Sequence, residues 1–299
     1  MEHIPDCRLR TVVKFFCRPF IISCPAHLHQ SVLLPFLSYF LPAMFQRLSG
    51  CWQQAMKQQR DENQANLQEI LYDVVVRLAT KDYIDLLRSV VLSVSSQFQG
   101  EENEEMMDAD APSSGGQMVA SVSELGKMVL SEPSLCGHLL QFLLSALWWP
   151  DSANSVKAAN ILESIVKYWA GLIPRNSSFF PNSEVASLCM SHLLNGIQLL
   201  GQHESNLSAL IHLGVLMYDT FLPIYPAVMS ELMMRNAGCS REDADQYQDK
   251  ASSLAAAGGL KINQKIERSK RELFRKMTSQ VIFVVIFDIV CFSTFIKNL

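Results

Sequence analysis

The residues best suited to chemistry lie in one short run, KINQKIERSKRELFRK, residues 261–276. Apolar residues recur in and beside it at i, i+4, i+11 and i+15, the spacing of one face of an α-helix. Basic side chains crowd the remaining surface. A basic amphipathic helix of this kind suits a phosphate backbone, an anionic membrane surface or an acidic partner, and an ordinary solvated helix face is the alternative. The apolar positions are Ile262, Ile266, Leu273 and Met277, and the candidate RNA- or partner-binding residues are Lys261, Lys265, Arg268, Lys270, Arg271, Arg275 and Lys276.

A second charged segment has the opposite sign. Six carboxylates fall between positions 101 and 110, and a Pro-Ser-Ser-Gly-Gly run follows them. High charge with small and breaker residues predicts an acidic, disordered loop over residues 99–118. We interpret it as a solvated spacer, with an acidic tether that touches a basic surface as the alternative. Its carboxylates are Glu101, Glu102, Glu104, Glu105, Asp108 and Asp110.

Catalytic chemistry is not indicated. No metalloprotease, nucleophile-elbow, P-loop or dinucleotide motif occurs. His138, His192 and His212 lie within apolar helical patterns, where histidine is more often a hydrogen-bonded core residue than a metal ligand. The eight cysteines contain no C-x-x-C pair, which indicates core residues of a reducing compartment. We therefore expect no enzyme activity, no metal site and no cofactor.

The elements that position these residues are all predicted to be helices. Residues 67–78 and 83–94 each repeat apolar residues at i, i+3, i+4, i+7, i+8 and i+11, and the polar break Thr80-Lys81-Asp82 predicts two antiparallel neighbours. Single-sided apolar faces need partners, and stacked helix pairs supply them, so the fold class is all-α, an α-solenoid of antiparallel pairs. The other expected helices cover 8–23, 27–60 (with breaks near Pro35 and Pro42), 121–132, 134–148, 152–172, 183–201, 204–235 and 261–280.

The predicted organisation has four parts. Residues 1–98 are helical repeats, 99–118 the acidic loop, 119–282 helical repeats ending in the basic helix, and 283–299 a divergent hydrophobic tail. The apolar run 281–296 would span about 24 Å as a helix, against a hydrocarbon core of roughly 30 Å. It also carries Asp288 at its centre. A membrane anchor over 281–296 is therefore the less favoured interpretation.

Several stretches carry a family resemblance. MEHIPDCRLR, RPFIISCPAHL, EEMMDADAP, SELGKMVLSEPSLC, GIQLLGQHESNLSALIHLGVLMYDTFLPIYP and ERSKRELFRKMTSQVI resemble consecutive stretches of the C-terminal portion of the exportin-5 family. These karyopherins are nuclear export receptors of the importin-β superfamily. The resemblance runs in order from Met1 to about Ile282, and the tail 283–299 departs from it. It implies HEAT- or armadillo-like helix pairs, in agreement with the helical pattern.

The resemblance also implies a function and partners. Receptors of that family carry small structured double-stranded RNA, the microRNA precursors, with Ran-GTP from nucleus to cytoplasm, and they contact nuclear pore proteins. A-form duplexes hide their base edges, so recognition through shape and phosphates is expected. This chain covers only part of such a receptor and would retain a share of the cargo surface. The alternatives are a truncated helical scaffold that binds other proteins, or a tail-anchored membrane protein.

Overall fold

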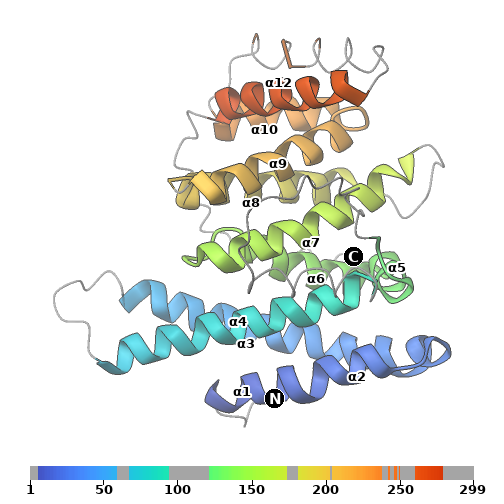
Figure 1. Ribbon diagram of the computed structural model, residues 1–299, viewed down its shortest axis with the longest axis vertical. Helices are drawn as coiled ribbons and strands as arrows, with labels where there is room; N and C mark the ends of the chain where they lie inside the picture. The colour runs from blue at the N-terminus through green and yellow to red at the C-terminus, as the bar shows by residue number, and fades with distance from the viewer. Residues whose placement is uncertain are drawn as a thin grey trace, which may run out of the picture. The chain divides into compact units, whose positions relative to one another are not determined.

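The computed structural model describes residues 6–58, 67–93, 121–173, 181–202, 204–237, 242, 246–247, 249 and 260–278. Within these ranges the regular secondary structure is helical, with one isolated bridge between Leu92 and Val122. The prediction of an all-α fold of packed helices is confirmed. The chain divides into two compact units, Met1–Phe142 and Leu143–Asn298 (Figure 1), so the two sides of the predicted acidic loop belong to the same unit.

The first unit is built around one long helix. It comprises α1 (Asp6–Val12), a π-helical stretch (Val13–Cys17), α2 (Arg18–Ser23), a 3₁₀ turn (Ala26–Leu28), a second π-helical stretch (His29–Leu33), α3 (Leu34–Gln58), α4 (Leu67–Val91), α5 (Glu124–Ser131) and the greater part of α6 (Pro133–Ala146). Helices α1, α2, α3 and α5 all pack against α4. Side chains of α4 consequently form the centre of this unit.

The prediction of two antiparallel helices at Thr80-Lys81-Asp82 is wrong, because α4 runs without a break from Leu67 to Val91. The segment contains neither glycine nor proline, so nothing in it forces a turn. Two of the three polar side chains are buried and paired, while Lys81 between them is exposed. Thr80 Oγ1 donates to the Val76 carbonyl at 2.8 Å and accepts from Trp52 Nε1 at 3.0 Å. Asp82 Oδ2 accepts from Arg10 Nε at 2.8 Å. Thr80 and Asp82 therefore face the core, and the helix continues through them.

Two proline positions also differ from expectation. Helix α3 continues through Pro42, where the sequence suggested a break. The carbonyl that loses its helical partner belongs to Ser38, which is exposed, so water can take the place of the missing N–H. The predicted helix 204–235 is instead two helices, α9 (Glu204–Phe221) and α10 (Pro226–Ala237). Proline suits the first turn of α10 because the N–H that it lacks has no helical partner there.

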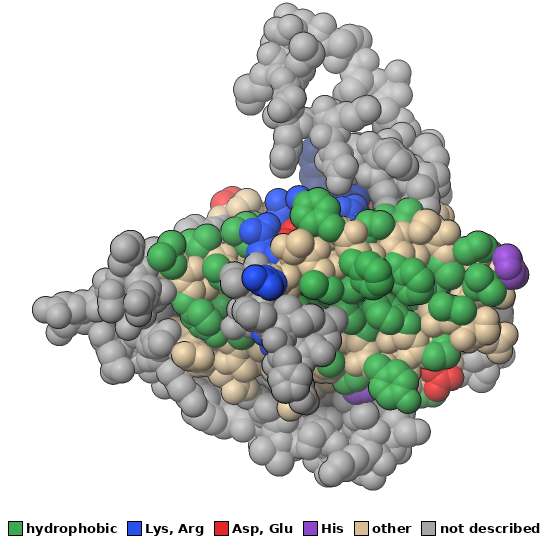
Figure 2. All heavy atoms as spheres, turned by 90° about the horizontal axis from the view of Figure 1, so that it is seen from below, with side chains coloured by type: hydrophobic (Ala, Val, Ile, Leu, Met, Phe, Trp, Pro, Cys, Tyr) green, Lys and Arg blue, Asp and Glu red, His purple; other side chains and the backbone are tan. Residues whose placement is uncertain are grey.

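Aromatic rings line the first unit from its core to its surface. Phe36 stacks on Phe40 at 5.0 Å between ring centroids, and Tyr83 makes an edge contact with Phe142 at 4.5 Å. Further out the rings are exposed to water, with Phe15, Phe16 and Tyr39 at 70%, 65% and 82%. Figure 2, which views the molecule from below Figure 1, shows hydrophobic side chains over much of the face turned to the viewer.

The second unit contains α7 (Ser152–Ala170), α8 (Ser183–Leu200), α9, α10 and α12 (Leu260–Thr278). Helix α9 packs against α7, α8 and α12, so it is central here as α4 is in the first unit. Side-chain caps begin two of its helices: Asp151 Oδ1 accepts from the Ala153 and Asn154 N–H groups, and Asn182 Oδ1 accepts from the Val185 N–H. These caps satisfy backbone donors that the first helical turn leaves without partners.

His192 is hydrogen-bonded, as expected, and partly buried, whereas the buried Nδ1 of His138 has no hydrogen-bond partner. The Nδ1 of His192 accepts from Trp148 Nε1 at 3.0 Å. Burial lowers the pKa of His192 to about 4, so the ring is neutral near pH 7. A neutral ring is required for this contact because the indole N–H can only donate.

The predicted acidic loop and the hydrophobic tail lie outside the described residues, as does the predicted anchor over 281–296. Among the described residues, one helical stretch, Ala26–Met56, is long and apolar enough by composition to cross a membrane, which is weak evidence for a membrane. Only 28% of its apolar window is buried, although Leu37, Met44 and Trp52 in this stretch are fully covered. A core helix of a helical protein passes the same test of length and composition.

The Trp52–Thr80 contact yields a stability prediction. Thr80→Val keeps the shape of the side chain but removes the hydroxyl that accepts from the buried Trp52 indole N–H, and losing this hydrogen bond costs about 1–3 kcal/mol. The free energy of unfolding from urea titration should fall by that amount. The same substitution at Thr11, which is exposed on α1, is the matched control and should change stability by less than about 0.5 kcal/mol. Equal effects at the two positions would contradict the role given to Thr80.

Candidate functional site

The predicted basic segment forms α12, a helix over Leu260–Thr278. The helix carries seven Lys and Arg residues and two Glu residues, so its formal charge is 7 − 2 = +5. The whole chain has a formal net charge of −4, so this helix is a local exception to the overall balance. Charge concentrated in this way is the electrostatic footprint that a polyanion-binding surface requires.

The buried face of α12 differs from the predicted apolar stripe. Phe274 is fully buried and Met277 is 2% exposed, whereas Leu273 and Ile266 are only partly covered. The side chain of Ile262 lies outside the described part. Phe274 follows Lys270 by one turn and precedes Met277 by one turn, so the face that docks runs through positions 270, 274, 277 and 278. The sequence pattern placed Leu273 on the apolar face, whereas the residue that the structure buries is Phe274, the next one along the helix.

Phe274 fixes the position of α12 on α9. Its ring lies 6.1 Å from the Tyr218 ring, centroid to centroid, and also rests on the backbone of Gly214. Any side chain at position 214 would occupy the space that the Phe274 ring fills, so this close approach of the helices requires glycine. The contact orients the helix about its own axis and thereby determines which basic residues face α9.

Among the basic residues, the side chain of Lys270 is largely covered where α12 packs on α9. Its Nζ donates to Asp219 Oδ2 at 2.7 Å, and the side chains of Lys270 and Asp219 are 18% and 29% exposed. The other carboxylate oxygen of Asp219 accepts from Tyr247 Oη at 2.7 Å. Burial, and then the Asp219 charge, raise the pKa of Tyr247, so this phenol stays a donor at every physiological pH.

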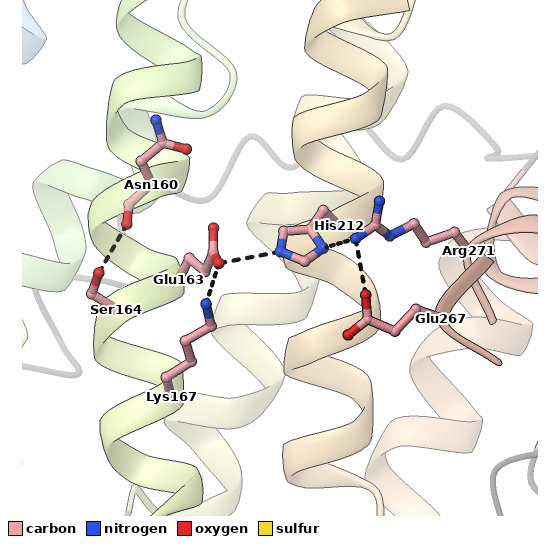
Figure 3. Close-up of polar contacts among 7 residues, drawn as sticks. All are labelled: Asn160, Glu163, Ser164, Lys167, His212, Glu267 and Arg271. Carbon is pink, nitrogen blue, oxygen red and sulfur yellow. Dashed lines mark hydrogen bonds and ion pairs between the residues drawn. The ribbon is translucent and has the colours of Figure 1, made fainter. Parts of the chain in front are cut away.

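Arg271 also contacts α9, although its side chain remains 40% exposed. Its Nη2 donates to His212 Nδ1 at 2.9 Å and makes a longer contact of 3.4 Å with Glu267 Oε2 (Figure 3). On the other side of the ring, His212 Nε2 lies 3.2 Å from Glu163 Oε1 on α7. Three helices are therefore joined by one chain of polar contacts.

Glu163 is held as a carboxylate in this arrangement. The hydrogen bond from His212 lowers the pKa of Glu163 to about 2, against the opposing effect of burial, and the Lys167 ammonium contributes in the same direction. A charged Glu163 accepts from both neighbours at neutral pH. The contact of His212 with Glu163 is therefore charge-assisted and stronger than one between neutral groups.

The remaining basic residues lie nearer to water. Arg275 Nη2 donates to Glu204 Oε2 at 2.9 Å, but both side chains are more than half exposed, so the pair contributes at most about 1 kcal/mol. Arg268 and Lys276 are exposed. Lys261 and Lys265 lie in the first turns of α12, and their side chains are outside the described part, as is the whole acidic loop.

The structure thus divides the predicted binding residues into two groups. Lys270 and Arg271 contact Asp219 and His212 of α9, with Arg271 still 40% exposed, while Arg268, Arg275 and Lys276 are the more exposed side chains. No metal-binding group of three or more His, Cys, Asp or Glu side chains occurs in the described ranges. The chemistry that this surface can perform is electrostatic attraction and hydrogen-bond donation to phosphate or carboxylate oxygens.

The contact between Gly214 and Phe274 can be tested by one methyl group. Gly214→Ala should displace the Phe274 ring and destabilise the protein by about 1–3 kcal/mol, because the added methyl overpacks the contact. Gly50→Ala is the matched control, since Gly50 is exposed within α3 and nothing approaches its missing Cβ. That substitution should stabilise the protein by about 0.5–1 kcal/mol through helix propensity. Urea unfolding of both variants measures the difference, and a stabilising Gly214→Ala would refute the close packing.

Comparison with known proteins agrees with the resemblance noted in the sequence. The family model described as "Exportin-5" matches residues 1–276. Among curated proteins, mouse Exportin-5 is 25% identical over 261 residues and human Exportin-5 is 24% identical over 261 residues. Each alignment covers 83% of this chain and 21% of the relative, so the chain spans about a fifth of the length of these proteins. With the family model matching more than nine-tenths of its length, the chain belongs to the Exportin-5 family.

Proposed function

We propose that this chain is a segment of a nuclear export receptor that shuttles between nucleus and cytoplasm. Family membership supports this proposal, as does the architecture of packed helices in the described part of the chain. The cargo of the whole receptor would be small double-stranded RNA of the microRNA-precursor type, bound together with Ran-GTP, and nuclear pore proteins would be transient partners. The proposed role contains no catalytic step and requires no cofactor or metal.

The proposed contribution of this segment is a share of the cargo surface. The observation that carries it is the exposure of Arg268 and Lys276 on a helix of formal charge +5. Double-stranded RNA presents phosphates and 2′-hydroxyls, while its base edges lie in a deep, narrow groove. A rigid helix with outward cations can contact such a backbone without reading sequence. Arg275 adds a third cation, because its exposed pair with Glu204 is weak enough to exchange for a phosphate.

Charge reversal at the outward positions tests this role. The double variant Arg268→Glu with Lys276→Glu should weaken binding to a hairpin RNA and reduce the slope of log K against log salt by about 1 for each phosphate that the helix no longer neutralises. Fluorescence anisotropy at several salt concentrations measures both quantities. Stability should change little because neither side chain is buried.

A matched control separates the helix from overall charge. Arg8→Glu with Lys14→Glu makes the same change in net charge at exposed positions of the first unit. This pair should reduce RNA affinity much less than the α12 pair. Equal reductions, or an unchanged salt slope for the α12 pair, would show that the basic helix is only solvated surface.

The role of Ran-GTP gives a further prediction. Because the chain spans about a fifth of its relatives, we expect it to bind hairpin RNA weakly and without cooperativity towards Ran-GTP. Size-exclusion chromatography of the chain with both partners, compared with the RNA alone, should show no ternary complex. Cooperative binding of Ran-GTP and RNA by the 299-residue chain would contradict the view that it holds only part of the receptor's surface.

A further inference from the structure

The geometry around His212 assigns its protonation state. Arginine can only donate hydrogen bonds, so Nδ1 of His212 must accept from Arg271 Nη2 at 2.9 Å through a lone pair. The ring is then neutral and carries its single proton on Nε2, which donates to Glu163 Oε1 at 3.2 Å. Figure 3 shows the ring between these two partners, one from α7 and one from α12. The docked arrangement thus depends on one tautomer of one side chain.

A second proton on His212 would be incompatible with this contact. The imidazolium has an N–H at both nitrogens, so Nδ1–H would point at the N–H groups of Arg271 and two positive groups would lie 2.9 Å apart. On the opposite side, the imidazolium would still donate from Nε2 to Glu163 and would gain an opposite charge. Protonation therefore acts in opposite directions on the two contacts: it breaks the link to α12 and keeps the link to α7.

We propose that His212 is a proton-sensitive latch for the basic helix: the neutral ring holds Arg271 and with it α12 against α9, and protonation releases Arg271 to solvent or to an anionic ligand. The docked state is stable above the pH at which His212 takes up its proton and weakens as pH falls through that value. The released guanidinium joins Arg268 and Lys276, so acidification enlarges the cationic surface of α12.

The other charged groups near the latch do not produce the same response. On α7, the pKa of Glu163 is lowered to about 2, so this carboxylate keeps its charge between pH 8 and 5.5, and Lys167 donates to it. On α12, the charged groups that the described contacts bring to the latch are Arg271 and its neighbour Glu267. On α8 and α10 the ionisable side chains Glu184, His192, Glu231 and Arg235 make no described hydrogen bond or ion pair with His212.

Hydrogen–deuterium exchange of the full chain tests the latch. After correction for intrinsic exchange, amides of residues 266–278 should become roughly tenfold less protected between pH 8 and pH 5.5, the ratio expected when a hydrogen bond to a charged group breaks. Amides of α7 should keep their protection, because the contact with Glu163 survives. A fall in protection of α7 and α12 alike would indicate general acid unfolding and overturn the proposal.

Two variants separate His212 from every other titrating group. His212→Gln offers one amide oxygen to Arg271 and one N–H to Glu163 at all pH values, so protection of 266–278 should become independent of pH. His212→Lys carries a permanent charge and should leave α12 poorly protected even at pH 8. The same pH response in His212→Gln as in the parent chain would refute the latch.

The parent chain alone provides a check that needs no variant. Long-range ¹H–¹⁵N spectra of histidine-labelled protein report which ring nitrogen carries the proton. At pH 8 the His212 signals should be those of a ring protonated on Nε2 only. Protonation on Nδ1 at that pH would exclude the hydrogen bond from Arg271 and with it the proposal.

Discussion

The position of α12 depends on the packing of a single ring. Phe274 is fully buried between Gly214 and Tyr218 of α9, and this contact sets the rotation of the helix about its axis. Since successive residues of an α-helix point about 100° apart, the rotation decides the direction of every basic side chain. With Phe274 inward, Lys270 and Arg271 meet partners on α9, while Arg268 and Lys276 face outward. One side of this positively charged helix therefore contacts α9, and the other side is exposed to water.

Some of the polar groups that link helices are paired in each unit. In the first, Thr80 and Asp82 enter the core because Trp52 and Arg10 supply hydrogen-bond partners. In the second, Asp219 joins Lys270 to Tyr247. A polar group without a partner in such a place would cost about 1–3 kcal/mol, whereas a paired one costs little and fixes which helices meet. Polar pairs therefore specify the neighbours of α4 and α9, and apolar area supplies most of the stability.

Docking on α9 withdraws part of the positive charge of α12 from solvent. Counting Lys and Arg along the helix therefore overestimates what an anion can reach. The pairs that hold the helix also differ in exposure, from the largely covered pair Lys270–Asp219 to the exposed pair Arg275–Glu204. In the proposed latch, Arg271 would serve both the docking of α12 on α9, through its acceptor His212, and the binding of an anion.

The sequence by itself determined the all-α class, the existence of most helices, and the concentration of basic residues in 261–276, because hydrophobic periodicity and composition are local properties. It also carried the family resemblance that the family model confirmed over residues 1–276. Tertiary structure alone decided that Thr80-Lys81-Asp82 continues a helix, that α12 buries Phe274 rather than Leu273, and that Lys270 and Arg271 contact partners on α9. Each of these depends on a partner distant in sequence, Trp52 for Thr80, Gly214 for Phe274 and His212 for Arg271, and no pattern within a single helix contains that partner.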